Sequence, residues 1–131
     1  GLSLVTGVLD KKFGFWSMPQ DKRQKFINRL YFALKELLLR FQDDWVNERI
    51  NKKNVLIVKF DDIMNDFETV MKNIIEFTEV EETDALLANI KETALAQKSY
   101  KSNHKYDLNK FGLTEDKIRI DCKPIYDTFL N

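Results

Sequence analysis

Apolar residues recur every three or four positions along most of this chain, which is the spacing of amphipathic helices. The pattern predicts four helices, over residues 19–50, 66–78, 83–97 and 114–129. Pro19 falls in the first turn of the longest one, where proline is tolerated because those amides lack intrahelical partners. Thr83 and Thr114 are the expected N-caps of the third and fourth helices.

One stretch departs from this spacing. Residues 55–58 read Val-Leu-Ile-Val, a continuous apolar run that predicts a buried strand over about 54–60. A strand that is apolar on both faces is typical of the centre of a parallel sheet. A lone strand would leave backbone groups unpaired, at roughly 1–3 kcal/mol each. We therefore expect a partial α/β domain, mostly helical, with one central parallel strand and a short extended piece near residues 4–6.

Two segments lack a clear period. Residues 1–18 read as a connector with turn points at Gly7 and Gly14, and residues 98–113 form a long polar, basic loop. Loops of this length in a compact domain are often functional. Several side chains in this loop could donate hydrogen bonds to an anionic ligand. They are Lys98, Lys101, Ser102, His104, Lys105 and Tyr106. A solvated lysine-rich loop without a ligand is the simpler alternative.

Composition limits the function classes. The 131 residues are 44% hydrophobic and carry 21 basic and 21 acidic side chains, so no overall positive charge directs the chain to nucleic acid or anionic lipid, although local basic patches are compatible with this balance. One histidine and one cysteine, Cys122, make a transition-metal site improbable, and we expect no metal. No apolar run approaches the ~18 residues of a membrane span, and no secretory leader is evident. We therefore expect a cytoplasmic protein.

Two further groups have both a functional and a structural interpretation. Asp61 and Asp62 follow the predicted strand, where α/β sheets place ligands, but acidic residues before a helix also satisfy its free amides. Phe13, Phe15 and Trp16 suit either an acceptor pocket or core packing.

The order of these elements resembles the C-terminal half of a sulfotransferase of bacterial type. The resemblance rests on a Phe60-Asp61-Asp62-Ile63 turn, on Asp66-Phe67-Glu68, on the Phe13-Gly14-Phe15-Trp16 entry to the long helix, and on a basic loop that leads into Phe111-Gly112-Leu113 and a last helix. It covers most of the chain. No single one of these motifs is specific, and the resemblance depends on their order.

The resemblance implies a P-loop-like fold and transfer of a sulfuryl group from 3′-phosphoadenosine 5′-phosphosulfate to a hydroxyl or amine of a small-molecule or carbohydrate acceptor. It places the cofactor contacts in the loop, at Lys101, Ser102, His104, Lys105 and Tyr106. The family's glycine-rich phosphate loop with its lysine, and its Arg and Ser pair for the 3′-phosphate, are missing from this sequence. We therefore expect a fragment that is inactive alone, with no assigned catalytic residue.

A second interpretation comes from a different class of protein. The chain could be a non-catalytic helical interaction module whose amphipathic helices dock a partner. Either interpretation predicts association through an unpaired sheet edge.

Overall fold

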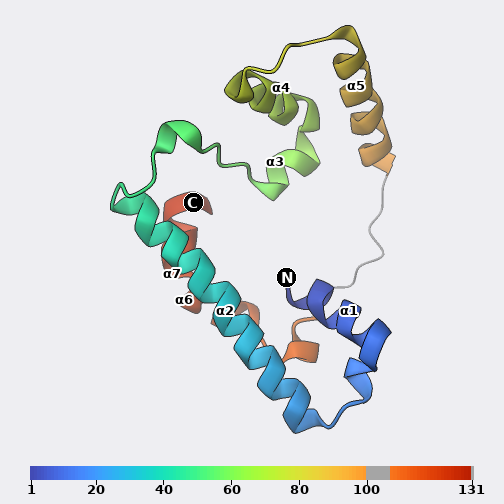
Figure 1. Cartoon of the computed structure of the whole chain (residues 1–131), viewed down its shortest axis with the longest axis vertical. Coiled ribbons are helices and arrows are strands. Elements are labelled where there is room, and N and C mark those ends of the chain that lie inside the picture. Colours follow the sequence, from blue (N-terminus) through green and yellow to red (C-terminus); the bar gives the residue numbers. More distant parts are fainter. Residues whose placement is uncertain (100–106, 131) are drawn as a thin grey trace. The chain divides into compact units, whose positions relative to one another are not determined.

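The computed structural model describes residues 1–99 and 107–130, and its regular structure in these ranges consists of helices and helical turns without any strand (Figure 1). The chain divides into two compact units. The first unit comprises Gly1–Ile50 and Lys105–Asn131, and the second comprises Asn51–His104. Within the described residues, no helix has the length and apolar character that crossing a membrane requires.

The first unit is built on one long helix. This helix, α2 (Gln20–Val46), follows α1 (Leu2–Phe13) and the short 3₁₀ turn η1 (Phe15–Ser17). The C-terminal part of the chain returns along α2 (Figure 1). Its elements are η3 (Asn109–Phe111), α6 (Glu115–Asp121), α7 (Lys123–Ile125) and a π-helical turn, Tyr126–Leu130.

Two apolar clusters hold these elements together. The buried core of the first unit consists of Phe15, Ile27, Phe111 and Leu113. A second cluster lies near the other end of α2, where the Phe129 ring is 5.5 Å from both Phe41 and Trp45 between centroids. Residues close to each end of α2 thus contact the C-terminal part of the chain, which fixes the direction in which that part runs.

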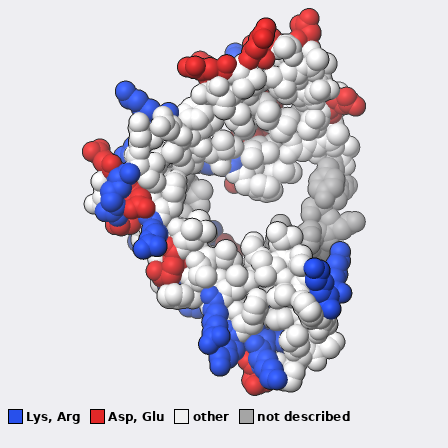
Figure 2. Space-filling view, viewed as in Figure 1, with Lys and Arg blue, Asp and Glu red and all other residues white. Residues whose placement is uncertain are grey.

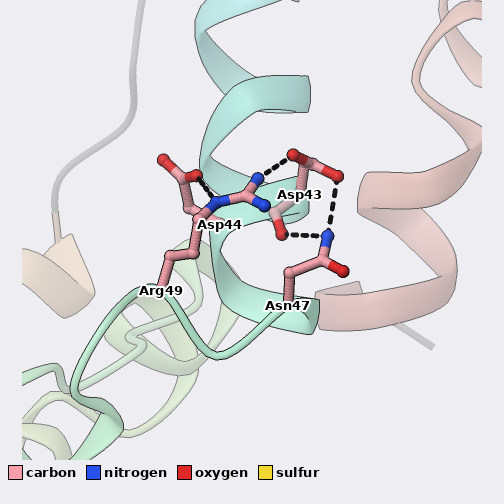
Figure 3. A network of polar contacts seen from close by, with 4 residues as sticks. All are labelled: Asp43, Asp44, Asn47 and Arg49. Atoms are coloured by element: carbon pink, nitrogen blue, oxygen red, sulfur yellow. Dashed lines mark hydrogen bonds and ion pairs between the residues drawn. The ribbon is translucent and has the colours of Figure 1, made fainter.

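A polar network ends α2. Two acidic residues, Asp43 and Asp44, lie in the last turn, where the helix dipole disfavours negative charge. The Arg49 guanidinium lies between them and donates to both carboxylates, with its Nε 2.6 Å from Asp44 Oδ1 (Figure 3). Asn47 Nδ2 donates to the Asp43 carbonyl and carboxylate, each at 2.8 Å. The hydrogen bond to Asp44 is the largest cause of a raised Arg49 pKa, so the guanidinium keeps its positive charge beside the two carboxylates.

The second unit is a smaller group of three helices. Its elements are α3 (Phe60–Asn65), α4 (Phe67–Thr78) and α5 (Asp84–Ser99), with Val70, Ile75, Ile90 and Ala94 buried. The Asp66 side chain caps α4 by accepting from the Thr69 amide at 3.3 Å, and the expected cap Thr83 accepts from the Leu86 amide at 3.2 Å.

The predicted α/β fold is wrong. After the 3₁₀ turn η2 (Lys52–Asn54), residues 55–59 have no regular structure, and α3 begins at Phe60. Leu56, Ile57 and Val58 are exposed. The apolar, β-branched composition favours a strand, but a strand needs a partner for its backbone donors and acceptors. No strand occurs in the described ranges, so neither the central parallel strand nor a P-loop-like sheet forms there.

The extended piece expected near residues 4–6 is also wrong, because these residues lie inside α1. Thr6 is buried, and its hydroxyl donates to the Leu2 carbonyl at 2.8 Å, so this β-branched residue is compatible with the helix. The helix ends at Gly14, whose φ of 62° suits glycine, with its amide donating to the Asp10 carbonyl at 2.8 Å.

Replacing Ile27 with alanine tests the core of the first unit. Ile27 is 2% exposed, so Ile27→Ala should lower the free energy of unfolding by about 2–5 kcal/mol through lost burial and a new cavity. Ile120→Ala is the matched control, since Ile120 is 74% exposed and its loss should change stability by less than about 0.5 kcal/mol. Urea unfolding followed by circular dichroism measures both. Equal effects would contradict this assignment of the core.

Candidate functional site at the anchor of the basic loop

The predicted cofactor contacts Lys101, Ser102, His104, Lys105 and Tyr106 lie outside the described residues. The structure does describe both flanks of this loop. The upstream flank is the end of α5 in the second unit, and the downstream flank is residues 107–113 in the first unit.

The downstream flank is a compact turn. Asp107 Oδ1 accepts from the Asn109 amide at 3.0 Å, and the Leu113 amide donates to the Leu108 carbonyl at 3.1 Å. Gly112 has a φ of 67°, a left-handed conformation that glycine adopts without strain, and it ends the η3 turn. The buried Phe111 and Leu113 lie on either side of it, so this segment is fixed by packing as well as by hydrogen bonds.

The turn packs against the entry to α2. The Trp16 ring lies 5.8 Å from Phe111 and 5.1 Å from Phe15 between centroids, and Gln24 Nε2 donates to the Phe111 carbonyl at 3.3 Å. Phe15 and Trp16 are therefore packed with the core, whereas Phe13 is exposed. The structure thus joins two segments that the sequence analysis treated as separate motifs.

Trp16 is held from several sides. The Lys110 ammonium lies 3.9 Å from the centre of the indole, and the Arg23 guanidinium lies 5.9 Å from it. Arg23 also donates to the Trp16 carbonyl at 2.6 Å, and the Trp16 amide donates to Asp10 Oδ1 at 2.9 Å. Cations over an indole are attracted by the negative face of the ring. Lys110, three residues after the described part of the chain resumes, is therefore held at this anchor.

The upstream flank borders a shallow pocket within the second unit. Its lining residues are Met64, Asn65, Asp66, Phe67, Glu68, Ala94, Gln97 and Lys98. Gln97 Nε2 is 3.4 Å from the Met64 sulfur, while the buried Gln97 Oε1 has no hydrogen-bond partner among the described residues. Lys98, at the start of the predicted loop, and Asp66, whose carboxylate caps α4, both line this pocket.

Asp61 and Asp62 lie in the first turn of α3, and both are exposed. The N-cap of α3 is Lys59, whose side chain makes no capping hydrogen bond. The two carboxylates interact favourably with the helix dipole, because they lie in the first turn, at its positive end. Across residues 1–99 and 107–130, no group of three or more His, Cys, Asp or Glu side chains is arranged to hold a metal ion.

A polar network that the sequence analysis missed links α2 to α6. Tyr31 Oη donates to Asp121 Oδ2 at 2.9 Å, and Lys117 Nζ lies 2.9 Å from the same oxygen. Burial and the Asp121 hydrogen bond raise the pKa of Tyr31 to about 12, while Lys117 and then Tyr31 lower the pKa of Asp121. Burial also raises the pKa of the Cys122 thiol. Only the Lys117 and Asp121 spacing was visible in the sequence, because Tyr31 is 90 residues away from Asp121.

Comparisons with known proteins give one positive result. A family model described as "Sulfotransferase domain" matches residues 23–119, which is most of the chain. The match begins inside α2 and ends inside α6, so it includes Phe111-Gly112-Leu113 but neither α1 nor Trp16. No curated protein and no solved structure matches significantly.

Gly112→Ala tests the loop anchor. The left-handed φ of Gly112 should cost an alanine about 1–2 kcal/mol, and its Cβ would lie only 3.1 Å from Gln24 Nε2. We expect the Gly112→Ala variant to unfold at a lower urea concentration than the wild type. Gly7→Ala is the control, because beyond the adjacent residues and the backbone of its own helix nothing lies within 4 Å of the added Cβ, and the helical site should gain about 0.5–1 kcal/mol. An unchanged Gly112→Ala midpoint would contradict the anchor.

Tyr31 should make stability depend on alkaline pH. Its pKa is raised in the folded state, so its contribution is complete below the unfolded value of 10.0 and is lost as pH rises toward about 12. The free energy of unfolding of the wild type should therefore fall relative to that of Tyr31→Phe over this interval. Parallel urea titrations of the two proteins from pH 8 upward measure the difference. A constant difference through this range would show that the hydrogen bond to Asp121 does not persist in solution.

Proposed function

This chain belongs to the sulfotransferase domain family, which transfers sulfuryl groups, and we propose that it is the C-terminal portion of such an enzyme. The donor would be 3′-phosphoadenosine 5′-phosphosulfate, and the acceptor a hydroxyl or amine of a small molecule or carbohydrate. The observation that carries the proposal is the family match over residues 23–119. A cytoplasmic location is part of the proposal and is supported by the free, buried Cys122 thiol.

The described residues do not provide a cradle for the donor's phosphates. A phosphate needs clustered backbone amides at a helix N-terminus, with fixed cations around it. Gly7 lies within α1, while Gly14 and Gly112 are single left-handed residues that end helical turns. None of them begins a glycine-rich turn followed by lysine. These residues alone do not support a transfer step, and we propose that the chain is inactive without a further part that holds the donor.

The contribution proposed for this chain is the basic loop. Its downstream end is fixed by Phe111, Gly112 and Leu113, and Lys110 is held against Trp16. Rigid attachment reduces the conformational entropy that a loop loses on binding a ligand. We propose that Lys101, Ser102, His104, Lys105 and Tyr106 contact the donor's phosphates or its adenine.

Calorimetric titration with 3′-phosphoadenosine 5′-phosphate tests this assignment. The wild-type chain should bind weakly, and His104→Ala/Lys105→Ala should weaken binding by more than about tenfold, because hydrogen bonds to charged groups are lost. Lys72→Ala/Lys91→Ala is a control in the second unit that also removes positive charge. Equal weakening by both double variants, or no heat from a chain shown to be folded, would overturn the loop assignment.

A turnover assay separates the loop assignment from the proposed inactivity. The chain supplied with 3′-phosphoadenosine 5′-phosphosulfate and a panel of phenol, alcohol and amine acceptors should form no sulfated product. Product formation would overturn the proposal that the chain needs a further part, whatever the calorimetry shows.

One observation supports the alternative function, a non-catalytic helical module that binds a protein partner. The described part of the chain is helical, and α2 exposes the large apolar side chains Phe32, Leu37 and Leu38. Docking of α2 onto a protein partner would cover them. Absence of ligand binding together with a stable folded chain would favour this second function.

A further inference from the structure

The segment that follows η2 exposes both its backbone and its apolar side chains. Leu56, Ile57 and Val58 are between 37% and 39% exposed. Among the described residues, no donor or acceptor bonds to the backbone N–H and C=O groups of these three residues. Val55 and Lys59, at the two ends of the segment, have extended dihedral angles. Residues 55–59 therefore have the composition and the open backbone groups of a strand without its partner.

One edge of this segment is more open than the other. In an extended chain the N–H and C=O groups of one residue point to the same edge, and successive residues alternate between the two edges. Leu56 and Val58 share one edge, where no described residue bonds their backbone groups. The other edge is partly in use, because the Val55 amide donates to a carbonyl of η2 at 3.3 Å and the Lys59 carbonyl accepts from an amide of α3 at 3.2 Å. A partner strand therefore pairs most completely with the edge of Leu56 and Val58.

The charged residues that flank the segment have opposite signs at equal distances from its middle. Lys53 lies four positions before Ile57, and Asp61 lies four positions after it. Lys52 and Asp62 each lie one position further out, and all four flanking residues are exposed. Figure 2 shows basic side chains over the η2 turn, beside uncharged surface. Two copies of this segment laid antiparallel about Ile57 therefore place the basic flank of each beside the acidic flank of the other, whereas a parallel pair in register would place like charges together.

We propose that residues 55–59 pair with the same residues of a second copy of this chain, as two antiparallel strands related by a twofold axis at Ile57. Leu56 of each copy exchanges both backbone hydrogen bonds with Val58 of the other. The two Ile57 side chains meet at the axis, and Lys59, the one charged residue within the segment, lies opposite Val55. The contact uses the same edge of each copy, so it closes at a dimer.

A second copy explains more than any other sheet edge does. The edge of a different polypeptide would also satisfy the backbone groups of the segment, but it gives no reason for opposite charges at equal distances from Ile57. The pairing lies between copies and is antiparallel, so it is distinct from the parallel sheet that the described residues do not form. It involves only residues of the second unit and does not depend on sulfuryl transfer.

Sedimentation equilibrium of the full chain at increasing concentration tests the proposal. Wild type should show a monomer–dimer equilibrium. Lys53→Glu places like charges together at both ends of the paired segment, so it should raise the dissociation constant of the dimer by at least about fivefold. Lys53→Glu/Asp61→Lys restores opposite charges between the copies and should recover most of the affinity. Lys91→Glu is the matched control, since it reverses an exposed charge of the second unit outside the segment and should dimerise like wild type.

Amide hydrogen exchange measured by nuclear magnetic resonance tests the register. At concentrations where the dimer forms, the amides of Leu56 and Val58 should exchange more slowly than in the monomer, while the Ile57 amide, on the other edge, should not. Far-ultraviolet circular dichroism checks that every variant keeps its helices. A chain that stays monomeric up to about 1 mM would overturn the proposal. So would a dimer that Lys53→Glu leaves unchanged, a charge swap that recovers no affinity, or protection of Ile57 in place of its two neighbours.

Discussion

The packing of Phe111 and Leu113 against Phe15 and Ile27 is the contact on which the first unit depends. It joins positions almost a hundred residues apart, so forming it costs loop-closure entropy that the buried apolar surface must offset. Once it forms, the chain after Leu113 can run along α2 and bring Tyr31 to Asp121. These polar contacts are therefore consequences of the apolar one, since Tyr31 and Asp121 have no local reason to meet.

The same packing gives the basic loop an asymmetric support. Its downstream end is held by the left-handed Gly112, by Gln24 on the Phe111 carbonyl and by Lys110 over Trp16. Its upstream end follows α5, whose last turns contribute Lys98 and Gln97 to a shallow pocket, and Gln97 Oε1 has no hydrogen-bond partner among the described residues. A binding loop gains precision from rigid elements that hold its ends. The structure supplies such an element at the downstream end of the loop, within the first unit, while the loop's own contacts remain a proposal.

Much of the helical structure could be read from apolar spacing, since α2 occupies Gln20–Val46 within the predicted 19–50. Spacing failed at residues 55–58 because strand propensity describes side chains, whereas a strand also needs a partner for its backbone. It failed at residues 4–6 because β-branched Val5 and Thr6 disfavour a helix only weakly. The basic loop and the Phe111-Gly112-Leu113 motif could be recognised in the sequence. The contact of the Lys110 cation with the Trp16 ring could not, because the two residues are 94 positions apart.

Family membership was predicted correctly while the fold was not, and the two results have different physical origins. A family model responds to the order and spacing of residue types along residues 23–119, which local sequence carries. A parallel sheet depends on strands that must come from elsewhere in a chain, and no strand occurs in the described ranges. The exposed apolar side chains of residues 56–58 follow from this, because no described part of their own unit covers a segment that is suited to burial. Sulfotransferase membership is thus a property of this sequence, whereas a complete donor site requires phosphate-binding groups that the described residues do not provide.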